Sequence, residues 1–319
     1  QVLAAALVAD ELGLPGPSLR AAMISRNKGF QRARFAAFGI GQPDFLVTDL
    51  LTDARDWAAD RLPVVIKPLS SAGSLGVEHV ADLAAFDQAA GRRGGQGRLL
   101  VEQAVDGPEY SWEALVRDGQ VWFANLTAKQ TTGPPNFIEV AHHTAVEFDA
   151  ATTGIIDELG RAVLAALGMR DGLVHLEFRL GQAGPSVMEV AVRTPGDYLM
   201  ELLGLTYGLD WFELTVRLML GLELPAPPAG PVRYAASYLP VADAGVVSEV
   251  SGLADVRAHP CVVDADVSVA PGDVLAAARS SNQRVGHVLL AAHDRHQLAA
   301  ALSDVRQALV VSTRPAGSS

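Results

Sequence analysis

Residues 64–80 read VVIKPLSSAGSLGVEHV, two short apolar runs on either side of a loop of small residues. The β-branched run that ends at Lys67 predicts one strand, and the run that ends at Val80 predicts another. Glycines between Ser70 and Gly76 let the loop's backbone amides approach a ligand closely. A fixed ammonium group beside such amides is an arrangement that binds phosphate. The lysine comes before the loop, so the stretch is not a P-loop, and an ordinary hairpin is the alternative.

A second set of residues lies at the end of the next predicted strand, in the sequence VEQAVDGPE of residues 101–109. It places Glu102 before a turn and Glu109 after it. A buried carboxylate needs hydrogen-bond partners, and an adenine amino group or ribose hydroxyls supply them. The two acids therefore suit a nucleoside contact, with two solvated acids at a turn as the alternative.

A third set comes from two neighbouring predicted strands, which contain HLEFR at residues 175–179 and MEVAVR at residues 188–193. Each strand presents one carboxylate between apolar residues, Glu177 on the first and Glu189 on the second. These carboxylates would repel each other at close range unless a divalent cation lay between them. Magnesium commonly bridges a carboxylate pair to nucleotide phosphates. An edge ion pair between Arg179 and Glu189 is the alternative.

The rest of the chain mixes helices and strands. Apolar residues at helical spacing predict helices, and alternating or β-branched runs predict strands. Short turns between consecutive strands make the middle of the chain a meander rather than a doubly wound sheet. The predicted helices are residues 2–12, 18–38, 82–90, 153–167, 199–222 with a break near 204–208, and 295–309; the predicted strands are residues 62–67, 77–80, 98–103, 109–116, 121–127, 172–180 and 186–192.

The distribution of charge excludes several classes of partner. The formal net charge of -11 repels phosphate backbones, and no basic run stands out, so we expect no nucleic acid. Arg26, Lys28, Arg32 and Arg34 share one predicted helix, where spacing alone favours a solvated face. Charges interrupt every apolar run well before the roughly 18 residues that cross a bilayer, so we expect no membrane partner.

Length and composition indicate a large folded unit. With 319 residues, of which 49% are hydrophobic and 19% charged, the chain can bury a core in two domains or in one with lobes. Its one cysteine, Cys261, permits no internal disulfide, which fits a cytoplasmic location, and we expect it to be a packing residue. The chain opens at Gln1 inside a predicted helix, and we expect an amino-terminal domain to be missing.

In this order and separation, the three sets resemble the ATP-grasp superfamily. The resemblance covers nearly the whole chain, from ELGLPG at residues 11–16 and RNK at residues 26–28 onward. The chain looks most like the carboxylate-amine ligases that make dipeptides and related amides, through GPEYS at residues 107–111 and FIEVAHH at residues 137–143. The implied fold is α+β, with two lobes that grip ATP, a carboxylase-like carboxy-terminal lobe and a missing amino-terminal pre-ATP-grasp domain.

The resemblance also implies how the chain is divided. Residues 1–45 would be helices that connect to the missing domain, and residues 46–105 would form the small lid lobe. Residues 106–225 would form the large catalytic lobe, and residues 226–319 the carboxy-terminal lobe. We expect a structural role for this last lobe.

A nucleotide site follows from the same resemblance. Lysines would contact the ATP phosphates, a loop of small residues would close over the triphosphate, and two glutamates would bind Mg²⁺. Many family members have an asparagine where this chain has Ala191, and for Lys129 an exposed strand lysine is the alternative. The implied contacts are Lys28, Lys67 and Lys129 to the phosphates; Ser70, Ser71, Gly73, Ser74 and Gly76 in the lid; Glu102 and Val105 at the adenine; Glu109 at the ribose; and Glu177 and Glu189 at the metal.

The implied reaction transfers a phosphoryl group from ATP to a carboxylate, and an amine then attacks the acyl phosphate. Arg193, whose planar fork suits phosphoryl groups and oxyanions, would steady the charge in both steps. Glu139, His142 and His143 would line the acceptor site, where an acid holds an amine and a histidine moves protons. Packed or surface histidines are the alternative. The expected partners are small-molecule carboxylate and amine substrates, with a homodimer left open.

Two other functions stay open from the sequence. A biotin- or purine-pathway enzyme of the same superfamily would carboxylate or formylate its substrate. A non-catalytic module would bind ATP without turnover, although the retained lysines, glutamates and Arg193 disfavour it. The sequence does not identify the carboxylate or the amine, because side-chain volumes in an acceptor pocket do not follow from a motif.

Overall fold

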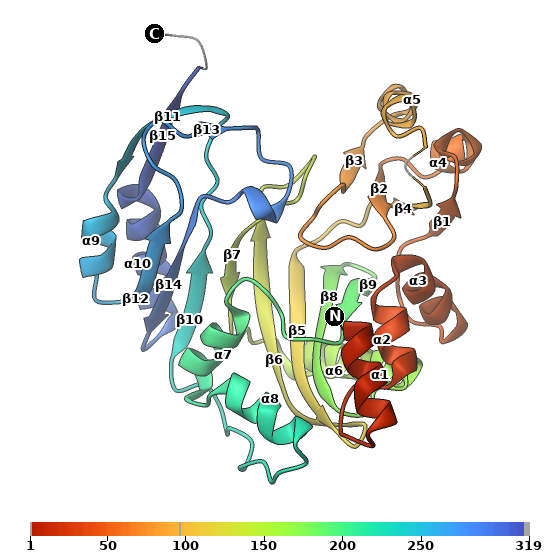
Figure 1. Cartoon of the computed structure of the whole chain (residues 1–319), viewed down its shortest axis with the longest axis horizontal. Helices are drawn as coiled ribbons and strands as arrows, with labels where there is room; N and C mark the ends of the chain where they lie inside the picture. The colour runs from red at the N-terminus through yellow and green to blue at the C-terminus, as the bar shows by residue number, and fades with distance from the viewer. Residues whose placement is uncertain (1, 96, 316–319) are drawn as a thin grey trace.

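In the computed structural model, which describes residues 2–95 and 97–315, a small lobe carries an antiparallel sheet with the strand order β1-β4-β2-β3. The helices α4 and α5 pack beside it (Figure 1). Phe86 on α5 is fully buried against Val64 and Ile66, which lie at alternate positions of β2. The elements of this lobe are β1 (Phe45–Thr48), η1 (Leu51–Ala54), α4 (Arg55–Ala59), β2 (Val64–Pro68), β3 (Glu78–Val80), α5 (Leu83–Arg92) and β4 (Leu99–Gln103).

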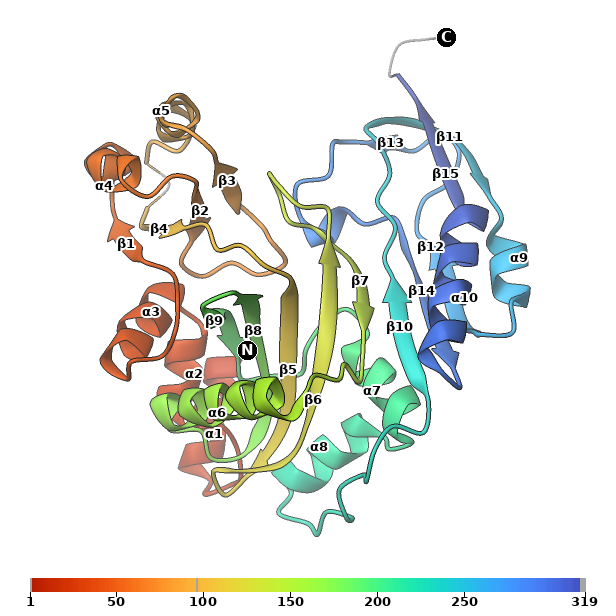
Figure 2. The ribbon, with the colours of Figure 1, turned by 180° about the vertical axis from the view of Figure 1, so that it is seen from behind.

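A large antiparallel sheet forms the centre of the molecule, with the order β12-β14-β10-β7-β6-β5-β8-β9. The helix α6 covers one face, and α7 and α8 cover the other (Figures 1 and 2). Trp112 and Leu115 lie on opposite faces of β5, so the first packs under α6 and the second under α7 and α8. The elements are β5 (Glu109–Arg117), β6 (Gln120–Thr131), β7 (Glu139–His143), α6 (Ala150–Leu167), β8 (Gly172–Gly181), β9 (Gly184–Ala191), α7 (Leu199–Tyr207) and α8 (Trp211–Met219).

The carboxy-terminal lobe continues this large sheet. The strand β10 pairs with β7 through Ala236–His143, Ser237–His142 and Tyr238–Ala141, and β14 and β12 follow it outward. A separate sheet has the order β13-β11-β15. The elements are β10 (Tyr234–Tyr238), β11 (Gly245–Ser251), α9 (Leu253–Ala258), β12 (Val262–Val267), β13 (Val274–Leu275), η2 (Ser281–Gln283), β14 (Gly286–Ala292), α10 (Arg295–Ala308) and β15 (Val310–Arg314).

Three helices precede the small lobe, namely α1 (Val2–Glu11), α2 (Leu19–Ser25) and α3 (Lys28–Ala37); α2 and α3 pack against α6 and β9, and α1 packs against α2. The prediction of a single helix over residues 18–38 is wrong, because one helix ends at Ser25 and the next begins at Lys28. Asn27 is extended, and its side chain accepts a hydrogen bond from the backbone N–H of Phe30, which starts α3 as a separate helix. Lys28 is consequently the first residue of a helix, not part of a continuous basic face.

The antiparallel meander is confirmed, as is the mixture of helices and strands. The expected break in the helix of residues 199–222 is confirmed too. Gly208 ends α7 in the left-handed conformation with φ 70°, and Asp210 begins α8 by accepting hydrogen bonds from two backbone amides. The stretch between α8 and β10, which holds four prolines, has no helix or strand.

Two expectations from composition concern the packing of Cys261 and the absence of a membrane-spanning helix among the described residues. Cys261 is 5% exposed and packs among the apolar residues under α9 and α10, as a packing residue would. In the part of the chain that the structure describes, no helix is long and apolar enough to span a bilayer. The last four residues of the segment assigned to 226–319 lie outside the described residues.

The contact between α6 and the large sheet predicts opposite effects for two glycines of the same helix. A Cβ at Gly160 would lie 2.8 Å from the ring of Trp112, which is 1% exposed, so Gly160→Ala is expected to cost about 1–3 kcal/mol of unfolding free energy. A Cβ at Gly154 would meet no described atom within 4 Å, and Gly154→Ala should stabilise the helix by up to about 1 kcal/mol. Urea unfolding measures both. Equal stability of the two variants would contradict the packing of α6 on Trp112.

Candidate active site

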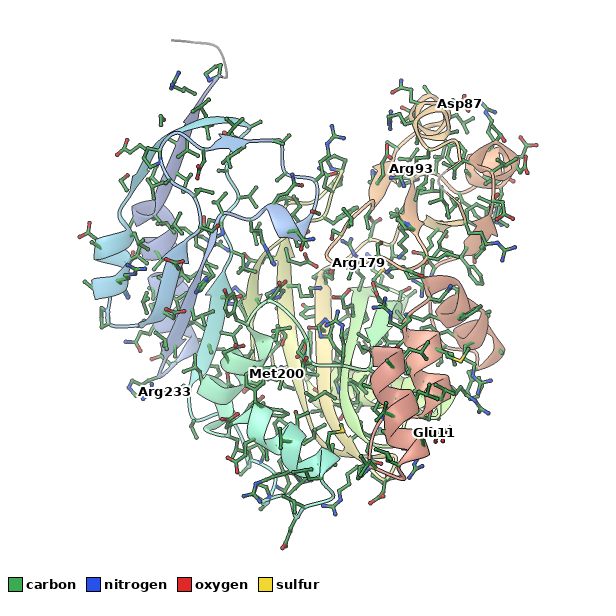
Figure 3. The ribbon with its side chains drawn as sticks, in the orientation of Figure 1. Glu11, Asp87, Arg93, Arg179, Met200 and Arg233 are labelled. Atoms are coloured by element: carbon green, nitrogen blue, oxygen red, sulfur yellow. The ribbon has the colours of Figure 1, made fainter. Side chains whose placement is uncertain are left out.

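A cavity of about 280 Å³ lies where the small lobe, the large sheet and the carboxy-terminal lobe meet. Figure 3 shows Arg179 at this junction, below the small lobe and above the body of the large sheet. The structure brings together most of the residues selected from the sequence. Those that line the cavity are Lys28, Lys67, Ser71, Gly73, Ser74, Glu102, Val105, Glu109, Lys129, Glu139, His142, Glu177, Glu189 and Arg193.

Three selected residues are not among those that line this cavity. Ser70 and Gly76 stand at the ends of the small-residue loop and line other surface hollows instead. His143 follows His142 in β7, and side chains alternate along a strand. Burial, followed by the charge of Arg306, lowers the pKa of His143 to about 4, so this ring is neutral at pH 7.

A buried ion cluster joins α3, β2 and β4 at one end of the cavity. Lys67 Nζ lies 2.5 Å from one oxygen of Glu102, and the guanidinium of Arg32 binds the other. Burial alone would raise the pKa of Glu102, but Lys67 and Arg32 hold it below its usual value. Arg32 is fully buried and also donates to the backbone oxygen of Met188 at 2.7 Å. Its interpretation as part of a solvated face is therefore wrong.

Glu102 is turned toward these two cations, so its carboxylate is already paired in the structure. The groups of this segment that line the cavity next to it are Gln103, Ala104 and Val105, at the end of β4. The backbone oxygen of Val105 accepts a hydrogen bond from Arg179 at 3.0 Å.

Lys28 contacts the small-residue loop that follows β2. Its backbone N–H donates to the carbonyl of Leu69 at 2.8 Å, and its Nζ donates to the carbonyl of Ser71 at 2.6 Å. The same ammonium lies 2.9 Å from Glu189, and Lys28 as a whole is only 5% exposed. The first turn of α3 therefore carries a lysine that contacts both the small-residue loop and one of the two opposed glutamates.

Lys129 on β6 is surrounded by acids. Its Nζ lies 2.6 Å from Glu177, 3.3 Å from Glu109 and 3.5 Å from Glu139. Burial disfavours the ammonium, yet the three carboxylates raise the pKa of Lys129 well above its usual value. The side chain is 2% exposed, so the alternative of an exposed strand lysine is wrong.

The two glutamates selected as metal ligands lie directly opposite each other. Glu177 on β8 and Glu189 on β9 are cross-strand partners. Arg179 pairs with Glu109 at 3.1 Å, so the alternative ion pair between Arg179 and Glu189 is wrong. Among the described residues, no group of three or more histidine, cysteine or acidic side chains could hold a metal ion. Two carboxylates suit Mg²⁺ where water and phosphate oxygens complete the shell, so the residues present fit that ion beside a nucleotide.

The opposite end of the cavity holds a cluster that the sequence did not reveal. Asp197 binds His142 Nε2 at 3.1 Å through one oxygen and the guanidinium of Arg284 through the other. Burial opposes ionisation, but the hydrogen bonds from His142 and Arg284 hold the pKa of Asp197 below its usual value. Arg193 lies nearby in the lining and is exposed. Sequence spacing gave no signal for Arg284, because it comes from the carboxy-terminal lobe.

That lobe contributes Ser281, Asn282 and Arg284 to the lining. The backbone N–H of Ser281 donates to the carbonyl of Gly73 at 3.0 Å, and its hydroxyl binds Glu139. The small-residue loop and the carboxy-terminal lobe therefore touch across the cavity. The carboxy-terminal lobe thus forms part of the cavity wall, and its expected structural role stays a prediction.

The buried cluster predicts a large loss of stability when its acid is removed. Glu102→Ala would leave Lys67 and Arg32 as uncompensated buried cations, with an expected cost of about 3–5 kcal/mol. Asp87 pairs with Arg55 at 2.7 Å on the outer surface of α5 (Figure 3), and Asp87→Ala should leave the unfolding midpoint unchanged. Chemical unfolding compares the two. A Glu102→Ala protein as stable as Asp87→Ala would show that the cluster is not closed to solvent.

Comparison with known proteins adds independent information. A family model described as an ATP-grasp domain matches residues 60–200, and a model described as the L-amino acid ligase C-terminal domain 2 matches residues 237–314. The uncharacterized protein y4rH of Sinorhizobium fredii is 28% identical over 302 residues, which are 90% of this chain and 61% of that protein. Carnosine synthase 1 of Gallus gallus is 27% identical over 253 residues, which are 72% of this chain and 27% of that protein.

The chain thus spans less than two thirds of the length of either relative. Among solved structures, the crystal structure of L-amino acid ligase from Bacillus licheniformis matches with a TM-score of 0.84 at 24% identity. The match covers 97% of this chain and 78% of that one, which confirms the expected α+β fold. Residues 60–200 thus match an ATP-grasp domain, and the chain resembles the L-amino acid ligases of the ATP-grasp superfamily.

Proposed function

We propose that this chain is the catalytic part of an ATP- and Mg²⁺-dependent carboxylate-amine ligase that forms an amide or peptide bond on amino-acid substrates. The observation that supports this function most directly is the pair Glu177 and Glu189, opposed on adjacent strands within one cavity and flanked by Lys28 and Lys129. Structural ion pairs alone do not need two like charges side by side. A cytoplasmic location belongs to the same proposal.

ATP would lie between the small lobe and the large sheet. Lys28 and Lys67 supply positive charge for its phosphates, and the backbone of Ser71 to Ser74 lines the same space. When bound between the two glutamates, magnesium supplies further charge neutralisation for the phosphates. We assign the nucleoside to the part of the cavity that Gln103, Ala104 and Val105 line, and the substrates to the part that Arg193, Asp197 and Arg284 line, the substrate end.

At the substrate end, the residues suit two successive steps. A substrate carboxylate oxygen attacks the terminal phosphorus of ATP, the bond to ADP breaks, and an acyl phosphate forms. A neutral amine then attacks the acyl carbon, phosphate leaves, and the amine loses one proton. Arg193 has an exposed guanidinium in the lining and would hold the oxygens that carry charge in both steps. Glu139 faces the same space and can accept hydrogen bonds from an amine.

His142 has a more limited role in this arrangement. Its Nε2 is bound to Asp197, so the ring fixes that carboxylate rather than offering this nitrogen to a substrate. Asp197 and Arg284 place opposite charges at the wall of the substrate end. An α-amino acid carries an ammonium and a carboxylate, and such a wall is complementary to both.

The proposed metal ligand gives a test of turnover. Glu189→Gln keeps the size of the side chain but removes the charge that a cation requires, and we expect ADP release to fall by at least about 100-fold. Glu158→Gln, at an exposed position of α6, is the matched control and should keep full turnover. Steady-state release of ADP at saturating Mg²⁺ measures both variants. Undiminished turnover in Glu189→Gln would remove this residue from the metal site.

The substrate class is tested by release of ADP and phosphate with Mg²⁺ over a panel of amino acids, supplied singly and in pairs. Release that needs a particular pair, with one new amide product by mass spectrometry, is the expected result. Release that needs bicarbonate or formate instead would favour the carboxylating or formylating enzymes of the superfamily. Binding of ATP without release under any of these conditions would contradict the ligase.

A further inference from the structure

A line of buried polar groups runs beneath the proposed metal site, from β5 across β8 to the cavity. Glu113 and His175 are cross-strand partners on these two strands. His175 Nδ1 lies 3.0 Å from Glu113 Oε1, and His175 Nε2 lies 3.1 Å from Glu177 Oε1. Both nitrogens of the ring are therefore bound to carboxylates, and the ring cannot turn without breaking one of these contacts.

Glu113 is the fixed end of this line. It is fully buried, and its second oxygen accepts hydrogen bonds from Asn125 at 2.8 Å and Thr127 at 2.7 Å. Asn125 in turn accepts from the hydroxyl of Tyr207 on α7 at 2.8 Å. A buried carboxylate is costly unless it is fully bonded, and these bonds tie Glu113 to β6 and β8 directly and to α7 through Asn125. Glu113 is not among the described residues that line the cavity, whereas His175 is, so the position of Glu113 matters to the site through His175.

Glu177 is the end that faces the cavity. The hydrogen bonds that it accepts from His175 and Lys129 both go to Oε1, at 3.1 and 2.6 Å. With one oxygen anchored twice, rotation of the carboxylate is restrained and Oε2 is the oxygen that remains for a cation. Lys129 alone would leave the group free to pivot, because an ammonium on a flexible stem fixes a point and not a plane.

We propose that Glu113 and His175 are positioning residues, which hold the carboxylate of Glu177 in the orientation that binds the divalent cation. This inference rests on the proposed function, because it concerns the same metal site. Groups that hydrogen-bond to metal ligands orient them, and their loss typically weakens metal affinity about 10–100-fold. The line from Glu113 supplies this orientation from the core of the large sheet, where Glu113 is fully buried.

The variant His175→Asn tests the two contacts of the ring separately, because it keeps the one to Glu113 and removes the one to Glu177. An asparagine amide lies near the position of Nδ1 and can still bond to Glu113, but it is too short to reach Glu177. Binding of Mn²⁺ in the presence of ADP, followed by electron paramagnetic resonance, reports the metal site without any turnover. We expect the Mn²⁺ dissociation constant to rise about 10–100-fold, and saturating metal to restore much of kcat.

Tyr207→Phe is the matched control. It removes the hydrogen bond from Tyr207 to Asn125, which belongs to the same polar cluster but reaches His175 only through Asn125 and Glu113. It should lower the thermal unfolding midpoint while leaving the Mn²⁺ dissociation constant at its normal value. Glu113→Gln is the second test variant, to be used also where His175→Asn does not fold. Its amide keeps the shape of the side chain but weakens the hold on the ring, so it should again weaken Mn²⁺ binding.

Unchanged Mn²⁺ affinity in the folded His175→Asn or Glu113→Gln protein would overturn the positioning role. Equal weakening in Tyr207→Phe would also overturn it, since the cluster would then act only through stability. If the unaltered protein bound no Mn²⁺ with ADP, the proposed function itself would fail, and this inference with it. The three results are distinguishable because the unaltered protein, the control and the test variants are measured by one signal.

Discussion

The opposition of Glu177 and Glu189 on adjacent strands is the constraint that the surroundings of the cavity have to satisfy. Two carboxylates at one cross-strand position repel each other, and a strand pair that brings them together is stabilised only if cations lie close. The structure places Lys129 against the first and Lys28 against the second. Each lysine comes from a different part of the chain, so the charge pattern of the site depends on the packing of α3 against β9 and on the order β6-β5-β8-β9 in the large sheet.

The buried cluster of Arg32, Glu102 and Lys67 holds the small lobe to this arrangement. Arg32 belongs to α3, Glu102 and Lys67 belong to paired strands of the small lobe, and Arg32 also reaches the backbone of β9 at Met188. A charge cluster of this kind is weak evidence for stability in itself, but it fixes which groups are neighbours. The cluster thereby fixes the position of α3, and with it Lys28, relative to β9, the strand that carries Glu189.

Much of the fold follows from local pattern, and the site follows only in part. Helix and strand periods predicted the meander and the placement of Glu177 and Glu189 on neighbouring strands, because those signals act over a few residues. The break at Asn27 was missed, since a capping side chain in a polar stretch does not interrupt helical spacing. Arg284 and Glu113 were missed for a different reason. The first comes from a distant lobe, and the second is a strand acid whose burial depends on partners far along the chain.

The ion pairs in the cavity also indicate which contacts would have to be replaced when a nucleotide binds. Lys28 and Lys129 are bound to carboxylates in this structure, so neither is a free cation waiting for phosphate. Under the proposed function, phosphate would replace Glu189 at Lys28 and a divalent cation would replace Lys28 at Glu189, while Lys129 would keep its bond to Glu177 Oε1. The two replacements compensate each other, because each ligand supplies a partner for the group that the other ligand leaves unpaired. Phosphate without metal would have to compete with Glu189 for Lys28, and metal without phosphate would have to compete with Lys28 for Glu189. Binding of the two is therefore expected to be cooperative, with the charge of the cavity itself as the coupling.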